Sequence, residues 1–248
     1  MQPPIRIAIL ECDTPLEKTK AKYGGYGGVF KTLMVGGAKL RGLDPERDLE
    51  MTSWPVEKEL QYPELEDIDA IMLTGSRYNA FDNTPWITSI VSYLRRVLEQ
   101  DRVRIIGVCF GHQLVARALG TPIGRSDIGW EVSVCPVELS PEGQRIFGLS
   151  NLKIFQMHRD VVQEVPKGMT LLGSSARCDV QGFYQKNRVI TVQGHPEFSK
   201  EIVSELLYAR HESGIFDDDE YQDAMQRVGD QHDGVKIAAA FVSFLLEE

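Results

Sequence analysis

The stretch VRIIGVCFGHQ, residues 103–113, is the most informative part of this 248-residue chain. Residues 103–108 form an apolar run that is typical of a buried strand, and residues 114–119 have the pattern of a helix. Cys109 stands between them, flanked by Gly107 and Gly111, which leave room for a tight turn and for close packing of helix on strand. This arrangement predicts a nucleophile elbow that presents Cys109 at the carboxyl edge of a sheet. The alternative is a small buried core cysteine.

A second segment, VQGHPE at residues 192–197, supplies possible partners for this thiol. It follows an apolar strand predicted over residues 188–192, and it places a histidine and a carboxylate two residues apart. Activation of a nucleophile needs a base beside it and an acid that orients the base. His195 and Glu197 can fill these two roles, with Cys109 as the nucleophile.

The two motifs, in this order, resemble those of the class I (triad) glutamine amidotransferases. The resemblance runs from a strand at residues 5–10 to about residue 198. Residues 23–26, 73–76 and 82–87 most resemble stand-alone gamma-glutamyl peptidases, and the next nearest likeness is the glutaminase domain of GMP synthase. The resemblance implies a Cys–His–Glu triad and a glutamyl thioester intermediate.

Attack on an amide carbonyl creates an oxyanion that backbone N–H groups must stabilise. The elbow predicts Phe110, the residue after the nucleophile, as one donor. The resemblance implies that the second donor is Ser76, preceded by Gly75. Arg77 stands where many family members carry proline. Its guanidinium could meet a substrate carboxylate, or the segment could be an ordinary turn with a solvated arginine.

Further substrate contacts are also implied by the resemblance. Gln113, one helical turn after Cys109, matches a residue that contacts the amino-acid end of the glutamyl substrate. Met157, His158 and Arg159 resemble a turn that meets the substrate's α-amino and α-carboxylate groups. A structural pair between His158 and Asp160 that holds this turn is an equally good interpretation.

Two other segments leave alternatives open. The glycine-rich residues 23–28 suit either a mobile flap, with Tyr26 walling the substrate pocket, or a flexible surface loop. Residues 129–131, Gly-Trp-Glu, match a family segment near the active site, but a half-buried tryptophan at a strand start explains them equally well. For His112 we expect a packing role, because it points away from Gln113 on the helix.

Strands and helices alternate along the first half of the chain. Strands are predicted at 5–10, 48–53, 68–74, 103–108 and 188–192, helices at 29–40, 86–99 and 114–119, and short strands over 130–184. This order predicts an α/β fold with a central, mostly parallel twisted sheet, helices on both faces in flavodoxin-like layering, and a smaller antiparallel region. We expect a single domain, residues 1–248, with a core over about 5–198 and a helical tail over 199–248.

In such a sheet, ligands bind outside the carboxyl ends of the strands. Residues 10–13, 74–77, 109–110 and 195–197 each follow a predicted strand. We therefore expect these four segments to meet at one rim.

Composition narrows the classes of function. The net charge is −9 and no basic run occurs, which argues against nucleic-acid binding. No stretch of 18 apolar residues occurs and no secretory signal is evident, so we expect no membrane association. The four cysteines lack the spacing of a zinc site or a disulfide framework, which favours a reducing cytoplasm and predicts neither metal nor cofactor.

Three functions remain. The first is a hydrolase of gamma-glutamyl amides, acting on a small substrate such as glutathione, a glutathione conjugate or another gamma-glutamyl peptide. The second is a glutaminase subunit that supplies ammonia to a separate synthetase partner, since the chain has no phosphate-binding loop of its own. The third is a non-catalytic regulatory member, which the intact Cys, His and Glu argue against.

Overall fold

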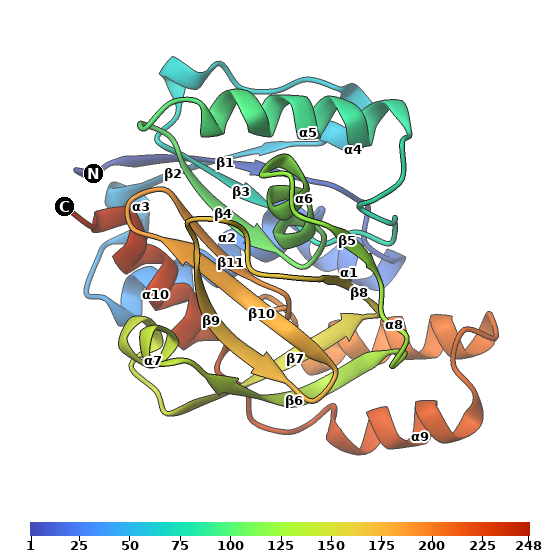
Figure 1. Ribbon diagram of the computed structural model, residues 1–248. Helices are drawn as coiled ribbons and strands as arrows, with labels where there is room; N and C mark the ends of the chain where they lie inside the picture. Colours follow the sequence, from blue (N-terminus) through green and yellow to red (C-terminus); the bar gives the residue numbers. More distant parts are fainter.

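The computed structural model describes all residues, 1–248, and its strands gather into one large sheet and one small one (Figure 1). The strands are β1 Ile5–Leu10, β2 Leu49–Trp54, β3 Ala70–Leu73, β4 Arg104–Val108, β5 Ile123–Arg125, β6 Glu131–Leu139, β7 Asn151–His158, β8 Asp160–Val162, β9 Thr170–Ser175, β10 Cys178–Gln185 and β11 Val189–Val192. The large sheet has nine strands in the order β2-β1-β3-β4-β11-β10-β9-β6-β7.

The sheet changes character at β11. Strands β2, β1, β3, β4 and β11 run parallel, whereas β10, β9, β6 and β7 continue the same sheet with antiparallel pairing. The parallel part brings the carboxyl ends of β1, β3, β4 and β11 to one edge. Strands β5 and β8 form a separate antiparallel pair.

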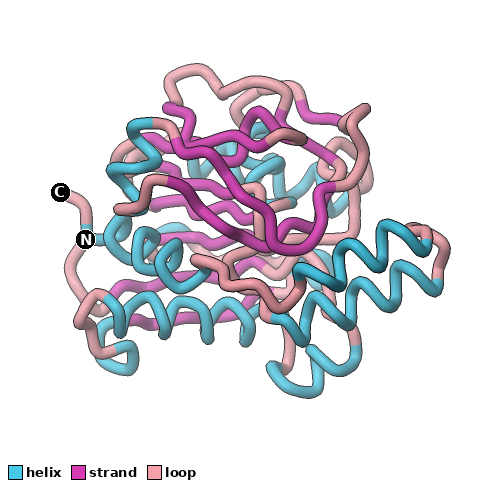
Figure 2. The backbone as a smooth tube through the Cα atoms, turned by 90° about the horizontal axis from the view of Figure 1, so that it is seen from below, coloured by secondary structure: helices cyan, strands magenta, loops and turns pink.

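Helices cover both faces of the parallel part (Figures 1 and 2). The helices are α1 Glu17–Tyr23, α2 Tyr26–Leu40, α3 Pro45–Asp48, α4 Val56–Glu59, the 3-10 turn η1 Leu65–Asp67, α5 Pro85–Leu98, α6 Phe110–Ala118, α7 Pro141–Phe147, α8 Lys200–Glu212, α9 Asp218–Arg227 and α10 Gly234–Leu246. Helices α2 and α10 pack on one face, and α5 and α6 pack on the other. The α/β fold with a central sheet between helices is thus confirmed.

Strand β1 shows why the sheet is covered on both sides. Ile7 and Ile9 belong to the core that includes α2 and α10, whereas Ala8 and Leu10 belong to the core that includes α5 and α6. Successive side chains of a strand point to opposite faces. A continuous apolar run therefore requires helices on both faces.

Several boundaries differ from those predicted. The helix expected over residues 29–40 begins at Tyr26, and the helix expected over 114–119 begins at Phe110, directly after the nucleophile candidate. Helix α1 was not predicted, because Glu17–Tyr23 carries only one buried side chain, Thr19, and so has no apolar stripe.

The carboxy-terminal helices form two further contacts. Helix α10 is largely apolar, and nine of its residues are buried, so it is part of the hydrophobic core. Helices α8 and α9 lie beside the carboxyl edge of the sheet, where they close a third, smaller core with β6 and β7 (Figure 1). None of the helices combines the length and the apolar composition needed to cross a lipid bilayer.

Candidate active site

Cys109 occupies a strained turn between β4 and α6. Its backbone has φ 51° and ψ −103°, an unusual conformation for a residue with a side chain. Its N–H donates to the carbonyl of Val192 at 2.9 Å, which ties the end of β4 to the end of β11. A Cβ on Gly111 would lie 2.5 Å from the Cβ of Leu73, so only glycine lets α6 pack this closely on β3. The strand–turn–helix arrangement predicted for residues 103–119 is present.

His195 and Glu197 lie beside this turn. The His195 Nδ1 and the Glu197 Oε1 are 2.7 Å apart, and both side chains are buried. The imidazole also stacks on Phe198, with ring centroids 3.9 Å apart and planes at 2°. A Cβ built on Gly75 would lie 2.6 Å from His195 Cε1 and 3.7 Å from the Cβ of Cys109. Gly75 therefore lies where the histidine and the cysteine meet.

The electrostatics of this group favour a charged imidazole. Burial alone would lower the pKa of His195, but the neighbouring Cys109 sulfur and the Glu197 carboxylate outweigh burial and raise that pKa well above its ordinary value. His195 is therefore able to hold a proton beside the Cys109 sulfur. Glu197 fixes which ring nitrogen faces the sulfur, because Nδ1 is held by the carboxylate.

The other three cysteines differ from Cys109. Burial raises the pKa of Cys12 and of Cys178, the latter to about 12, and it also raises the pKa of Cys135. A buried thiol without a base is inert. Of the four thiols, only that of Cys109 lies in the pocket beside His195.

The four segments that follow predicted strands line one cavity of about 300 Å³. They contribute Asp13, Gly75, Ser76, Arg77, Cys109, Phe110 and His195. The cavity lies at the carboxyl edge of the parallel strands, as the general rule for open α/β sheets requires.

Two backbone donors face this cavity. Phe110 is the first residue of α6, and the first N–H groups of a helix have no carbonyl partner within it. The N–H of Ser76 donates no hydrogen bond within the protein. Ser76 and Phe110 both line the pocket.

Gln113 and the turn after β7 are linked. The Gln113 side-chain amide donates to the carbonyl of Asp160 at 2.9 Å and to Oε1 of Gln193 at 3.1 Å. Gln113, Met157, His158 and Asp160 all line the cavity. A hydrogen-bonded glutamine thus connects the elbow helix to the turn that was expected to meet the glutamyl head.

His158 and Asp160 are linked, but through the backbone carbonyl of Asp160 and not through its carboxylate. His158 Nε2 lies 3.1 Å from Oε2 of Glu131, and its Nδ1 lies 3.1 Å from the backbone carbonyl of Asp160. The Asp160 carboxylate pairs instead with Arg125, at 3.0 Å. Pairing across β6 and β7 sets His158 opposite Glu131, and residue spacing along the chain does not reveal that register.

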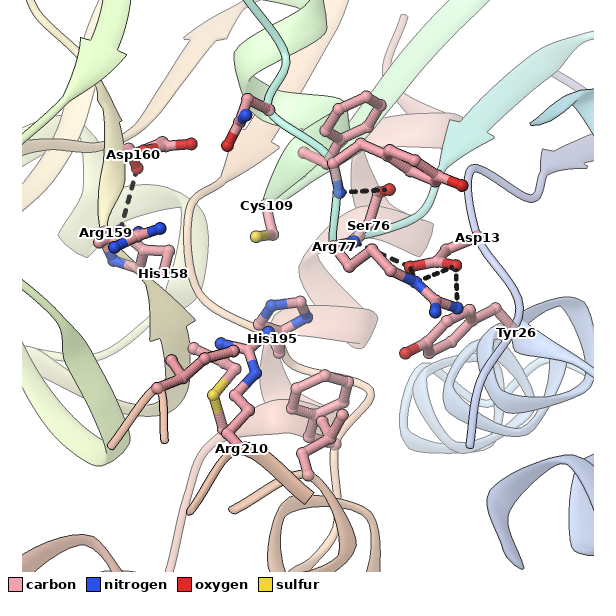
Figure 3. A pocket seen from close by; sticks show the side chains of 18 of the residues that line it. Asp13, Tyr26, Ser76, Arg77, Cys109, His158, Arg159, Asp160, His195 and Arg210 are labelled. Carbon is pink, nitrogen blue, oxygen red and sulfur yellow. Dashed lines mark hydrogen bonds and ion pairs between the residues drawn. The ribbon is translucent and has the colours of Figure 1, made fainter. Parts of the chain in front are cut away.

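Arg77 lines the cavity, but its charge is already neutralised. Its guanidinium lies 2.7 Å from Oδ1 of Asp13, and its backbone N–H donates to Oδ2 of the same carboxylate at 2.8 Å. It also donates to the carbonyl of Thr14. Neither alternative for Arg77, a substrate contact or a solvated arginine, included Asp13 as a partner, and Figure 3 shows this pair.

The glycine-rich residues 23–28 are neither a flap nor a loose loop. Gly24 and Gly25 make the short turn between α1 and α2, and Gly27 donates its N–H to the Glu11 carboxylate. A Cβ on Gly28 would lie 1.9 Å from the carbonyl oxygen of Tyr23, so the two helices meet too closely for any side chain there. Tyr26 is buried and lines the cavity, as expected for a pocket wall.

His112 packs inside the protein. It is fully buried, its Nδ1 lies 2.8 Å from Oγ1 of Thr191, and burial lowers its pKa to about 3. It is therefore a neutral side chain within the core.

Sequence reasoning missed the contribution of α8. Leu206, Ala209 and Arg210 of this helix line the cavity, together with Trp130 at the start of β6. The helical tail predicted over residues 199–248 includes α8, but nothing in its pattern indicated which element this helix would cover. Only the Gly-Trp-Glu segment around Trp130 carried a signal.

Comparison with known proteins places the chain in a family. Residues 40–209 match the class-I glutamine amidotransferase family. A glutamine amidotransferase-like protein of Schizosaccharomyces pombe is 38% identical over 97% of this chain and 98% of its own length. The chain therefore belongs to the class-I glutamine amidotransferase family.

Two further similarities are informative. Gamma-glutamyl peptidase 2 of Arabidopsis thaliana is 29% identical, with 83% of this chain and 81% of the relative covered. The crystal structure of a glutamine amidotransferase from Methylobacillus flagellatus superimposes with a TM-score of 0.73 at 19% identity, covering 100% of this chain and 97% of that one. The second similarity concerns the fold alone.

Proposed function

We propose that this protein hydrolyses gamma-glutamyl amide bonds, with Cys109 as nucleophile, His195 as acid and base, and Glu197 as the residue that orients His195. The observation that carries the proposal is the buried His195–Glu197 pair, at 2.7 Å, beside a cysteine in an elbow conformation. These are the three roles that nucleophilic catalysis needs. Similarity to gamma-glutamyl peptidases supports the choice of substrate class.

In the proposed reaction the Cys109 thiolate attacks the carbonyl carbon of the amide. The oxyanion accepts hydrogen bonds from the N–H groups of Phe110 and Ser76. Protonated His195 gives its proton to the leaving nitrogen, the C–N bond breaks, and a glutamyl thioester remains. His195 then takes a proton from water, whose oxygen attacks the thioester, and the C–S bond breaks to release glutamate.

The glutamyl head is assigned to the side of the cavity that Gln113 and the 157–159 turn form. Gln113 is held by the Asp160 carbonyl and by Gln193, so its side chain is positioned before substrate arrives. Tyr26 and Gly75 would form the opposing wall.

A glutaminase subunit that feeds a synthetase partner is the alternative. The similarity to the gamma-glutamyl peptidases of Arabidopsis thaliana favours the peptidase over this alternative. A subunit of this kind would release ammonia from glutamine and would need its partner for full activity.

The test is hydrolysis by the purified chain alone. We expect it to release glutamate from a gamma-glutamyl dipeptide without any added protein, and with a higher kcat/KM than it shows for glutamine, because a larger leaving group contributes binding energy that ammonia lacks. Cys109→Ala should abolish turnover, whereas Cys135→Ala, which changes a half-buried cysteine away from the cavity, should retain it. Turnover of glutamine alone, and only with a second protein present, would favour the amidotransferase subunit.

A further inference from the structure

Arg210 is a cavity-lining arginine without an ionic partner. It lies near the end of α8, and its guanidinium carbon sits 4.6 Å from the ring centroid of Trp130 and 6.0 Å from that of Phe216. Its Nη1 is buried and makes no hydrogen bond. No carboxylate lies within ion-pair distance of it.

The two carboxylates that line the cavity already form ion pairs with other arginines. Asp13 is held by Arg77, and Asp160 is held by Arg125. Arg159, which belongs to the turn assigned to the glutamyl head, lies over the same tryptophan, with its guanidinium carbon 5.1 Å from the Trp130 centroid. The net charge of the chain is −9, yet this part of the cavity presents unneutralised cations.

A buried donor on a cation is costly when nothing accepts from it. Burial lowers the pKa of Arg210, although the Cys109 sulfur and Asp13 act in the opposite direction. Stacking on Trp130 holds the guanidinium plane without supplying an acceptor. The missing acceptor is therefore expected to come from a ligand, and a carboxylate matches a guanidinium best in charge and geometry.

The position of Arg210 indicates which part of a ligand it meets. In Figure 3 the Arg210 side chain extends toward His195. Asp160, whose backbone carbonyl accepts a hydrogen bond from Gln113, lies farther from Arg210, past Cys109. His195 protonates the leaving nitrogen in the proposed reaction, so the leaving group lies on the His195 side of the sulfur. The glutamyl head is assigned to the Gln113 side.

We propose that Arg210 binds the carboxylate of the leaving amino acid or peptide, and so makes the site selective for gamma-glutamyl peptides with a free carboxyl terminus. This inference rests on the proposed gamma-glutamyl hydrolase function. Glutamine has no such group on its leaving nitrogen. Arg210 is thus a specificity residue supplied by a helix that lies outside the elbow and the triad.

The experiment compares three substrates on the full chain: gamma-glutamyl-alanine, the same dipeptide with an amidated carboxyl terminus, and glutamine. The wild-type protein should prefer the free acid over the amide by kcat/KM. Arg210→Gln should lower kcat/KM for the free acid roughly 10- to 100-fold and change the values for the amide and glutamine by less than about threefold. Arg210→Lys, which keeps a charge but not the planar fork, should lie between the two.

Arg95→Gln is the matched control, because Arg95 is an exposed arginine on α5, away from the cavity. An equal loss on all three substrates would overturn the inference, since Arg210 would then act on the glutamyl head or on the fold. A wild-type protein that hydrolyses acid and amide equally well would also overturn it, without the need for any variant. Failure of the wild-type protein to hydrolyse either dipeptide would instead overturn the proposed function.

Discussion

The chemistry of single residues centres on the buried ring of His195. Phe198 stacks on one of its faces, Glu197 holds its Nδ1, and Gly75 leaves space at its Cε1. These contacts permit only a small range of ring orientations. The carboxylate has an additional electrostatic effect, because it stabilises the imidazolium over the neutral imidazole.

The dependence of kcat/KM on pH tests this effect. The raised pKa of His195 keeps this proposed general acid charged at pH values where an ordinary histidine is neutral. Glu197→Gln removes one cause of that shift, so the alkaline fall in kcat/KM should move to lower pH. His195→Ala should cost several powers of ten in kcat, and Glu197→Gln should cost less. An alkaline limb that stays in place in Glu197→Gln would contradict this division of roles.

At the scale of elements, the contact between α6 and β3 positions the proposed nucleophile, Cys109. Gly111 lies in the first turn of α6, directly over Leu73 at the end of β3. The resulting close approach holds the N-terminus of α6, and with it the Phe110 N–H, against the Gly75–Ser76 turn that follows β3. We therefore expect the close packing of α6 on β3 to set the distance between the two proposed oxyanion donors.

Gly111→Ala should both destabilise the protein and lower its activity. The new Cβ would overlap Leu73, and overpacking of this kind costs about 1–3 kcal/mol in the free energy of unfolding. Gly36→Ala in α2 is the control, because its Cβ would make ordinary contact with Val235 at 3.5 Å and should be neutral or stabilising by up to about 1 kcal/mol. Urea denaturation measures both variants. Equal stability of the two would show that α6 does not need the close approach.

On the scale of the whole molecule, the carboxy-terminal helices complete both the hydrophobic core and the wall of the cavity. Helix α10 buries Phe241 in the core beside α2 and β1, and the chain termini lie close together at the opposite end from the cavity (Figure 1). Helix α8 closes the cavity through Arg210 and Leu206. The last fifty residues thus contribute to both stability and the site.

Phe241→Ala tests whether this helix and the site unfold together. The side chain is fully buried, so its truncation should lower the free energy of unfolding by about 3–5 kcal/mol. Val235→Ala, at a residue 49% exposed, should change it by less than about 0.5 kcal/mol. Circular dichroism and tryptophan fluorescence should give the same urea midpoint in each variant. Separate midpoints would show that α10 unfolds as an independent unit.

Local patterns in the sequence determined the parallel part of the sheet and the elbow. Apolar runs such as residues 103–108 predict buried strands. Glycines on both sides of a cysteine predict a tight turn with no room for side chains beside it. Strand ends meet at one edge of a parallel sheet, so the convergence of Asp13, Ser76, Cys109 and His195 on one cavity followed from the order of elements.

Only the tertiary structure decided the partners of the charged side chains. Arg77 pairs with Asp13, His158 with Glu131, and Arg210 with no residue of the protein. Ion pairs depend on strand register and on which helix covers which edge, and these are long-range choices that leave no periodic trace in the chain. The same reason explains the glycine-rich segment, where Gly28 allows close contact between α1 and α2 that the sequence pattern does not reveal.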